Sequence, residues 1–501
     1  MMLLLAVSPI VAILIGMVIM RKSAMYVAPI VTVYAIILSL IFFQTDINTV
    51  IIQSKSGIIE GIKIICLLWP AFIILKIMVF TGAIGKVKEV LSGVTCDKRA
   101  QLIIISSMFV TFLEGAAGAG SPAAIAGPFL VGLGFNPVVA AAASLLGDST
   151  AASWGGAGLT TINGSSALIK AGIMTAAQSS VMVGRIHIFG LFLIPYILIY
   201  MAFGKKGFKN FAPFLIFSSL CTPTILFFIS NFIGPELASL GTGVLSIAAS
   251  VIFLKFYKLD TPEEYRYKKE EIPRDIVREK INYSSFQAFG PYIILSLALP
   301  IVRYSFPLNV LAKYGYIMWV AAVVFVSSYL GGLILKLKTS SYLVHAKNAA
   351  LNVFPALITI STLLVLSNIM KVSGMISIMA NTIAMVTRDL YPAMSPVIGS
   401  LGAFITGTGL GSNIMFAPMH LEAATKLGLN PITIFAGQNA GASLGNLICT
   451  NNIIAVAITV DLIGREGEIM KKVFKPFFII VSTYMVVTML YTHIIFPTWG
   501  L

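Results

Sequence analysis

Long apolar segments separated by short polar loops recur from one end of the chain to the other. An apolar stretch of about 20 residues is long enough to cross the roughly 30 Å hydrocarbon core of a membrane as a helix. Several segments are shorter, and they gather in two glycine-rich stretches, Phe112–Gly155 and Phe404–Gly445. Such interruptions are typical of broken helices or re-entrant hairpins. The pattern predicts an all-α polytopic membrane protein with about 12–16 membrane segments.

The two glycine-rich stretches are similar to each other. Leu133–Pro137 reads LGFNP, and Leu427–Pro431 reads LGLNP at nearly the separation that also relates Phe112 to Phe404. We therefore predict two repeats, residues 1–203 and 288–501. Residues 204–287 join them and contribute two linking spans and a charged cytoplasmic connector.

Lysine and arginine concentrate in alternate loops, which the positive-inside bias assigns to the cytoplasm. This assignment puts both termini outside and gives the second repeat the opposite orientation to the first. Inverted-topology repeats with interrupted helices are typical of secondary transporters, whose substrate binds near the membrane midplane between the repeats. The expected location is the cytoplasmic membrane, with the chain in direct contact with the lipid bilayer.

Composition narrows the classes further. Hydrophobic residues make up 58% of the 501 positions, well above the roughly 45–50% of soluble domains. The net charge of +15 comes from basic residues in short loops, so we expect no nucleic-acid partner. The four cysteines, far apart in sequence, predict neither a disulfide framework nor a metal site; they are Cys66, Cys96, Cys221 and Cys449.

Each glycine-rich break can start a half-helix inside the membrane, where backbone N–H groups and the helix dipole favour an anion such as a carboxylate. Hydroxyl and amide side chains beside the breaks can bind a substrate hydroxyl without adding charge. Close packing of helices around small residues is the alternative interpretation of the glycines. The predicted substrate-binding residues are Gly115, Gly118, Gly120, Ser121, Ser149, Ser153, Thr406, Thr408, Ser412, Asn413, Gln438 and Asn439.

Two acids lie in these apolar surroundings, Glu114 and Asp148. An ionisable side chain at membrane depth costs roughly 2.5–3.5 kcal/mol on insertion scales, so such residues usually serve function. We predict that both take part in proton coupling. A structural acid that caps a broken helix is the alternative for Glu114. His420 carries a weaker signal, because a loop position explains it as well as a binding role, and Lys170 is expected at the surface.

Several short motifs, in this order along most of the chain, resemble the L-lactate permease family. They are FLEGAAGAGSP at Phe112–Pro122, FLVGLGFNP at Phe129–Pro137, MVGR at Met182–Arg185, SNFIGPEL at Ser230–Leu237, GAFITG at Gly402–Gly407, SNIMFA at Ser412–Ala417 and LIGREGEI at Leu462–Ile469. The resemblance implies proton symport of short 2-hydroxymonocarboxylates, chiefly lactate and glycolate. It also implies a relationship to transporters with re-entrant hairpins, among which homodimers are common.

The expected function is therefore import of a small organic anion with a proton, without catalytic residues, bound metal or cofactor. Two alternatives stay open. A sodium-coupled carrier of another carboxylate would hold the ion with Asp148, Asn413 and exposed carbonyls. An intramembrane enzyme would use Glu114 and Asp148 as a carboxylate pair.

Overall fold

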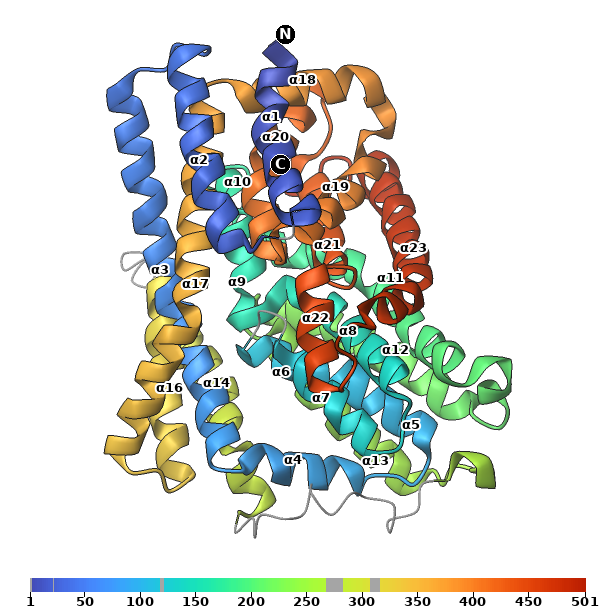
Figure 1. Ribbon diagram of the computed structural model, residues 1–501. Helices are drawn as coiled ribbons and strands as arrows, with labels where there is room; N and C mark the ends of the chain where they lie inside the picture. The colour runs from blue at the N-terminus through green and yellow to red at the C-terminus, as the bar shows by residue number, and fades with distance from the viewer. Residues whose placement is uncertain (1, 21, 118–120, 267–282, 307–315) are drawn as a thin grey trace.

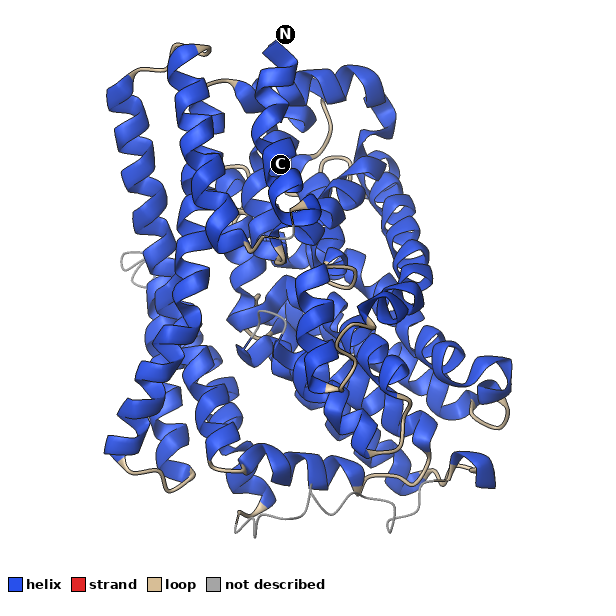
Figure 2. Ribbon diagram, in the orientation of Figure 1, coloured by secondary structure: helices blue, strands red, loops and turns tan. Residues whose placement is uncertain are grey.

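The computed structural model describes residues 2–20, 22–117, 121–266, 283–306 and 316–501. Within these residues the regular structure is helical (Figure 2), apart from one isolated bridge between Asp97 and Arg266. Nine helical segments are long and apolar enough to cross a membrane, and five shorter apolar helices accompany them in the described part of the chain. The predicted all-α polytopic class is confirmed.

The first half contains helices of very different lengths. Local signals begin several of them: Asp46 accepts a hydrogen bond from the Thr49 amide at 3.0 Å, and Thr175 forms a capping box with Gln178. The helices are α1 (Met2–Leu14), α2 (Ala24–Ile41), α3 (Ile47–Phe80), α4 (Ala83–Ser92), α5 (Lys98–Ile103), α6 (Val110–Ala117), α7 (Ser121–Gly132), α8 (Pro137–Ala151), α9 (Gly155–Gly164), α10 (Ser166–Lys170) and α11 (Ala176–Phe203).

Two helices link the halves, and some helices of the second half resemble helices of the first in length. For example, α3 and α17 each contain 34 residues. The linking helices are α12 (Ala212–Phe228) and α13 (Ala238–Phe256). The second half comprises α14 (Ser285–Ser305), α16 (Tyr316–Ile334), α17 (Thr339–Val372), α18 (Met375–Thr387), α19 (Tyr391–Thr406), α20 (Gly409–Leu427), α21 (Pro431–Gly445), α22 (Thr450–Thr459) and α23 (Glu466–Leu490).

The two 34-residue helices, α3 of the first half and α17 of the second, pack against each other in opposite directions. Along α3 and α17, which lie side by side in Figure 1, Gly57 meets Val365 while the Trp69 indole donates to the Ala346 carbonyl at 2.8 Å. Residue numbers rise on one helix as they fall on the other, so the pair is antiparallel. This arrangement fits the predicted inverted repeats.

The short helices α4 and α18 also occupy corresponding places in the two halves. Each follows a left-handed glycine, Gly82 with φ 75° and Gly374 with φ 79°, which turns the chain sharply at the end of the preceding long helix. In Figure 1, α4 lies at the lower end of the molecule and α18 at the upper end. Two helices related by an inverted repeat would lie at opposite ends of the molecule, as α4 and α18 do.

The central segment of the first half is enclosed by protein. Helix α5 continues through a π-helical turn, Ile104–Phe109, into α6, and the span Lys98–Ala116 is 100% buried. The linking helix α13 is only 33% buried, which leaves most of its surface for lipid. Glu114 therefore lies near the end of a continuous helical segment, α5 to α6, that other helices surround on all sides.

Candidate functional site

The two predicted proton-coupling residues meet in the structure. Glu114 on α6 and Asp148 on α8 are 3% and 1% exposed, and their side chains form a hydrogen bond to each other. Such a bond between two carboxyl groups requires that one of them carries a proton. Glu114 Oε2 and Asp148 Oδ1 have no hydrogen-bond partner among the described residues. Two buried carboxyl groups this close favour a state in which they share one proton, and these two oxygens are left as acceptors.

Two glycines allow the helices around this pair to come close. A Cβ at Gly147 would collide with the Ser106 carbonyl, so α8 lies directly on the π-helical turn before α6. A Cβ at Gly115 would likewise collide with the backbone of Leu240 on α13. Close packing therefore explains Gly115, as the alternative interpretation of the glycines proposed.

The first glycine-rich break lies largely outside the described residues. This applies to Gly118 and Gly120 and to the side chain of Ser121, at which α7 begins. Their predicted part in substrate binding stays a prediction.

The second break is visible in full. Helix α19 ends at Thr406, Gly407 takes a left-handed conformation with φ 79°, and α20 begins at Gly409. The Thr408 hydroxyl caps the new helix by accepting from the Gly411 amide at 3.0 Å, while Thr406 donates to the Thr408 carbonyl at 2.9 Å. The protein interior therefore contains a helix N-terminus, whose backbone N–H groups and dipole suit a carboxylate.

The predicted residue Ser153 belongs to a buried network that joins the two halves. Its hydroxyl donates to Asn439 Oδ1 at 2.7 Å and lies 2.7 Å from His187 Nε2. Because the Ser153 hydroxyl donates its hydrogen to the Asn439 amide oxygen, it can only accept from His187, so His187 Nε2 carries the hydrogen. His187 Nδ1 is then the acceptor of the Tyr484 hydroxyl, at 3.1 Å. Asn439 in turn donates to Thr161 Oγ1 at 3.1 Å.

A matching network occupies the second half. His420 Nε2 donates to Gln438 Oε1 at 2.8 Å, and the Tyr391 hydroxyl donates to His420 Nδ1 at 2.6 Å. The Gln438 amide then donates to Ser412 Oγ at 3.0 Å and to Asn413 Oδ1 at 3.4 Å. His420 lies inside α20 and is fully buried, so the loop position considered from sequence is wrong.

The two networks meet on α21, where Gln438 and Asn439 are neighbours. Asn439 bonds to Ser153 across the halves, and Ser443 donates to the Ser149 carbonyl in the same antiparallel register. The Asn413 amide also reaches the Thr160 carbonyl at 3.4 Å. The hydroxyl and amide groups that were predicted separately in each half therefore form one polar interface between the two halves.

The backbone just after Ser153 is unusual. In α9, Gly156, Ala157 and Gly158 have φ values of 58°, 57° and 84°. Left-handed conformation is costly for alanine, and strained backbone of this kind concentrates at functional sites. The turn precedes Thr160 and Thr161, which bond to partners in the networks. Gly156 and Gly158 favour a left-handed backbone, whereas the alanine between them does not.

Sequence reasoning missed His187, Tyr484, Tyr391 and Thr161. The histidine had a usable signal, because an ionisable residue within an apolar span usually has a functional partner. The tyrosines gave none, since each is one of many aromatic residues in membrane helices.

Asn413 also borders a small cavity of about 50 Å³ between α10, α17 and α20. Lys170 and Lys371 line it, and Lys170 forms an ion pair with Glu60 of α3. The Lys170 side chain is 56% exposed, which agrees with the surface position expected from sequence. Across the described residues, no group of three or more His, Cys, Asp or Glu side chains is arranged to hold a metal ion.

Comparison with known proteins places this arrangement in a family. The model of the L-lactate permease family matches residues 2–339 and 298–495. The chain is 24% identical to the L-lactate permease of Bacillus subtilis strain 168, over 92% of this chain and 90% of that protein. It is also 24% identical to the glycolate permease GlcA of Escherichia coli K12, over 98% and 96% respectively.

Another relative, the L-lactate permease of Halalkalibacterium halodurans, is 25% identical over 94% of this chain and 93% of its own. Among solved structures, the YdaH transporter of Alcanivorax borkumensis aligns with a TM-score of 0.40 and 13% identity over 85% of each chain. The family match covers nearly the whole sequence. The chain belongs to the L-lactate permease family.

Proposed function

We propose that the protein imports small 2-hydroxymonocarboxylates, such as lactate and glycolate, together with a proton. One observation carries the coupling: Glu114 and Asp148 are buried and share a hydrogen bond that requires a proton. The curated relatives named lactate and glycolate permeases support the substrate class. A proton moving with a monocarboxylate cancels its charge, so the loaded carrier avoids exposing a net ion to lipid.

The neutral groups between the halves would bind the anion. Backbone N–H groups at the start of α20, with Thr408 at its N-cap, suit the carboxylate. When the substrate binds, the Gln438 and Asn439 amides would each give up one of their present hydrogen bonds and form one with the 2-hydroxyl group. Helix α8 connects the two functions, because it carries Asp148 next to Ser149, whose carbonyl receives the Ser443 hydroxyl.

The membrane topology is part of the proposal. Residues 1–203 and 288–501 form inverted repeats in the cytoplasmic membrane, both termini lie outside, and the substrate binds between the halves. The antiparallel contacts of α3 with α17 support this topology, as does the pairing of Ser153 on the first half with Asn439 on the second. Charge concentrated in alternate loops supports the orientation.

Uptake of labelled lactate and glycolate into proteoliposomes tests the function. Proton and sodium gradients are imposed separately, with the same membrane potential in each case. We expect accumulation that needs an inward proton gradient and does not respond to sodium. Accumulation driven by sodium alone would replace proton symport by the sodium-coupled alternative, and chemical conversion of the substrate would indicate an enzyme.

A further inference from the structure

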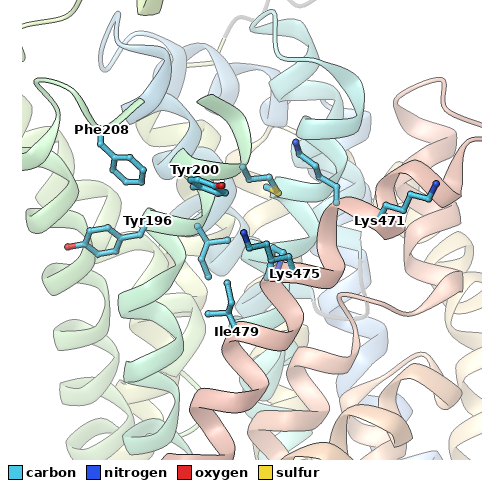
Figure 3. Close-up of a pocket in the computed structure, with 10 residues that line it drawn as sticks. Tyr196, Tyr200, Phe208, Lys471, Lys475 and Ile479 are labelled. Atoms are coloured by element: carbon cyan, nitrogen blue, oxygen red, sulfur yellow. The ribbon is translucent and has the colours of Figure 1, made fainter. Parts of the chain in front are cut away.

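A cavity of about 530 Å³ lies between α11 and α23, away from the polar networks. Figure 3 shows Tyr196 and Tyr200 on one helix and Lys471, Lys475 and Ile479 on the other. The proposed transport function assigns no role to this cavity.

The lining of the cavity carries three positive charges, Lys471, Lys472 and Lys475. Lys472 and Lys475 line it from positions three apart on α23, where like charges repel. None of the described lining residues is acidic. The nearest acid along the helix, Glu468, is held by Arg465 through hydrogen bonds of 2.7 and 2.9 Å. A bound anion would relieve the repulsion between the lysines.

The remaining walls are apolar and aromatic. Ile197, Met201, Phe208 and Ile479 contribute hydrocarbon surface. Lys475 Nζ lies 5.0 Å from the centre of the Tyr200 ring, a cation–π distance. A small water-soluble anion would leave the hydrocarbon surface uncovered. The lining therefore suits a ligand with a negative head and an apolar tail.

The cavity also lies near the ends of membrane helices, where ligands with a charged head and an apolar tail are found. The lysines precede the apolar part of the candidate span Glu466–Ile495, and Tyr200 is near the end of the span Ala176–Phe208. Tyrosine and lysine at the ends of membrane helices mark the boundary between hydrocarbon and water. Basic pockets between helices on the cytoplasmic side bind lipid head groups. In Figure 3, the Lys471 ammonium is directed away from the tyrosines, so it lies at the rim.

We propose that this cavity binds an anionic phospholipid. The phosphate lies between Lys472 and Lys475, and one acyl chain follows the apolar wall formed by α11 and α23. The same two helices carry His187 and Tyr484, whose side chains are 3.1 Å apart. A lipid bridging the cytoplasmic ends of these helices therefore supports the pairing on which the first polar network depends.

Native mass spectrometry of the purified full chain tests the site. The probes are phosphatidylglycerol and phosphatidylcholine with identical acyl chains, and glycerol phosphate as the soluble head group. We expect the wild-type protein to retain phosphatidylglycerol in preference to phosphatidylcholine. The Lys472→Gln/Lys475→Gln variant should lose roughly 30-fold in this preference, since each of the two lysines near a lipid phosphate contributes about 1 kcal/mol.

Two controls make the result decisive. The Lys336→Gln/Lys338→Gln variant removes the same charge from exposed loop positions and should retain the lipid, as should Lys472→Arg/Lys475→Arg. Equal retention of the two lipids by the wild type would overturn the proposal, as would equal losses in the cavity and loop variants. Binding of glycerol phosphate as strong as that of the lipid would also overturn it, because the site would then take a soluble anion.

Discussion

In the first half, α6 brings Glu114 into contact with Asp148, whereas the matching end of α19 in the second half carries Thr406, which only ties its own turn together. The acids and the strained backbone of α9 lie in one half, and in the other half Thr408 caps the helix that follows the second glycine-rich break. Under the proposed function the two halves would divide the chemistry. The first half would hold the proton and the second would bind the anion.

The largest expected effect comes from removing the acids. Glu114→Gln or Asp148→Asn should abolish proton-driven accumulation, which in a one-to-one symporter is about tenfold per unit of imposed pH gradient. Exchange of internal for external lactate should persist, because it needs no net proton movement. Uptake and exchange are measured in the same proteoliposomes. The exposed Glu89→Gln variant serves as the control and should behave as the wild type.

If exchange disappeared along with accumulation, the acids would be needed for substrate binding or folding, and the division between the halves would fail. A Thr406→Val variant extends the comparison to the matching position. It should weaken uptake only modestly, without altering the dependence on the proton gradient.

The next effect concerns the amides on α21. Gln438→Leu removes the acceptor of His420 Nε2 and a candidate ligand, while Ser412 keeps its hydrogen bond to the Gly399 carbonyl. A substrate hydroxyl bound without the amide is left unpaired at a cost of about 1–3 kcal/mol, so the KM for lactate should rise roughly 5- to 150-fold. Initial uptake rates over a range of lactate concentrations give this value. An unchanged KM with a lower maximal rate would show that Gln438 does not contact the substrate.

A smaller effect is expected from the two tyrosines, which occupy equivalent places in the two networks. Tyr484→Phe and Tyr391→Phe each remove one hydrogen bond to a histidine. Each should lower the free energy of unfolding by about 1 kcal/mol. Thermal unfolding in detergent compares them directly. A large loss for one and none for the other would mean that the networks do not serve equivalent structural purposes.

The smallest expected change is at the strained turn of α9. Ala157→Gly removes a side chain from a left-handed residue with φ 57° and should stabilise the protein by about 1 kcal/mol. Gly156→Ala adds the same strain one residue earlier and should destabilise it by a similar amount. Melting temperatures of the two variants should move in opposite directions. Shifts of the same sign would show that packing, and not backbone strain, governs this turn.

Much of the fold was predictable because membrane helices leave a strong hydropathy signal. The recurrence of LGFNP as LGLNP at Leu133–Pro137 and Leu427–Pro431 also indicated the repeated element order. The acids Glu114 and Asp148 stood out because charges are rare at membrane depth. Their mutual hydrogen bond was not predictable, since it depends on how α6 and α8 pack.

The rest of the site depends on contacts between distant parts of the chain. His187 meets Tyr484 only because α11 and α23 run antiparallel. The burial of His420 depends on how α20 packs against its neighbours. The left-handed turn at Ala157 had no sequence signature, because alanine does not favour that conformation. Local patterns indicate the spans and the acids, while tertiary packing determines which polar groups meet.

Proton movement measured alongside substrate movement tests the central claim most directly. Proteoliposomes containing a pH-sensitive dye are exposed to a lactate gradient with no imposed pH gradient, and internal acidification is followed with labelled lactate uptake. The account predicts one proton entering with each lactate in the wild-type protein and no lactate-linked acidification in Glu114→Gln, although lactate exchange continues. Lactate uptake by the wild type without acidification, or acidification unchanged in Glu114→Gln, would contradict it.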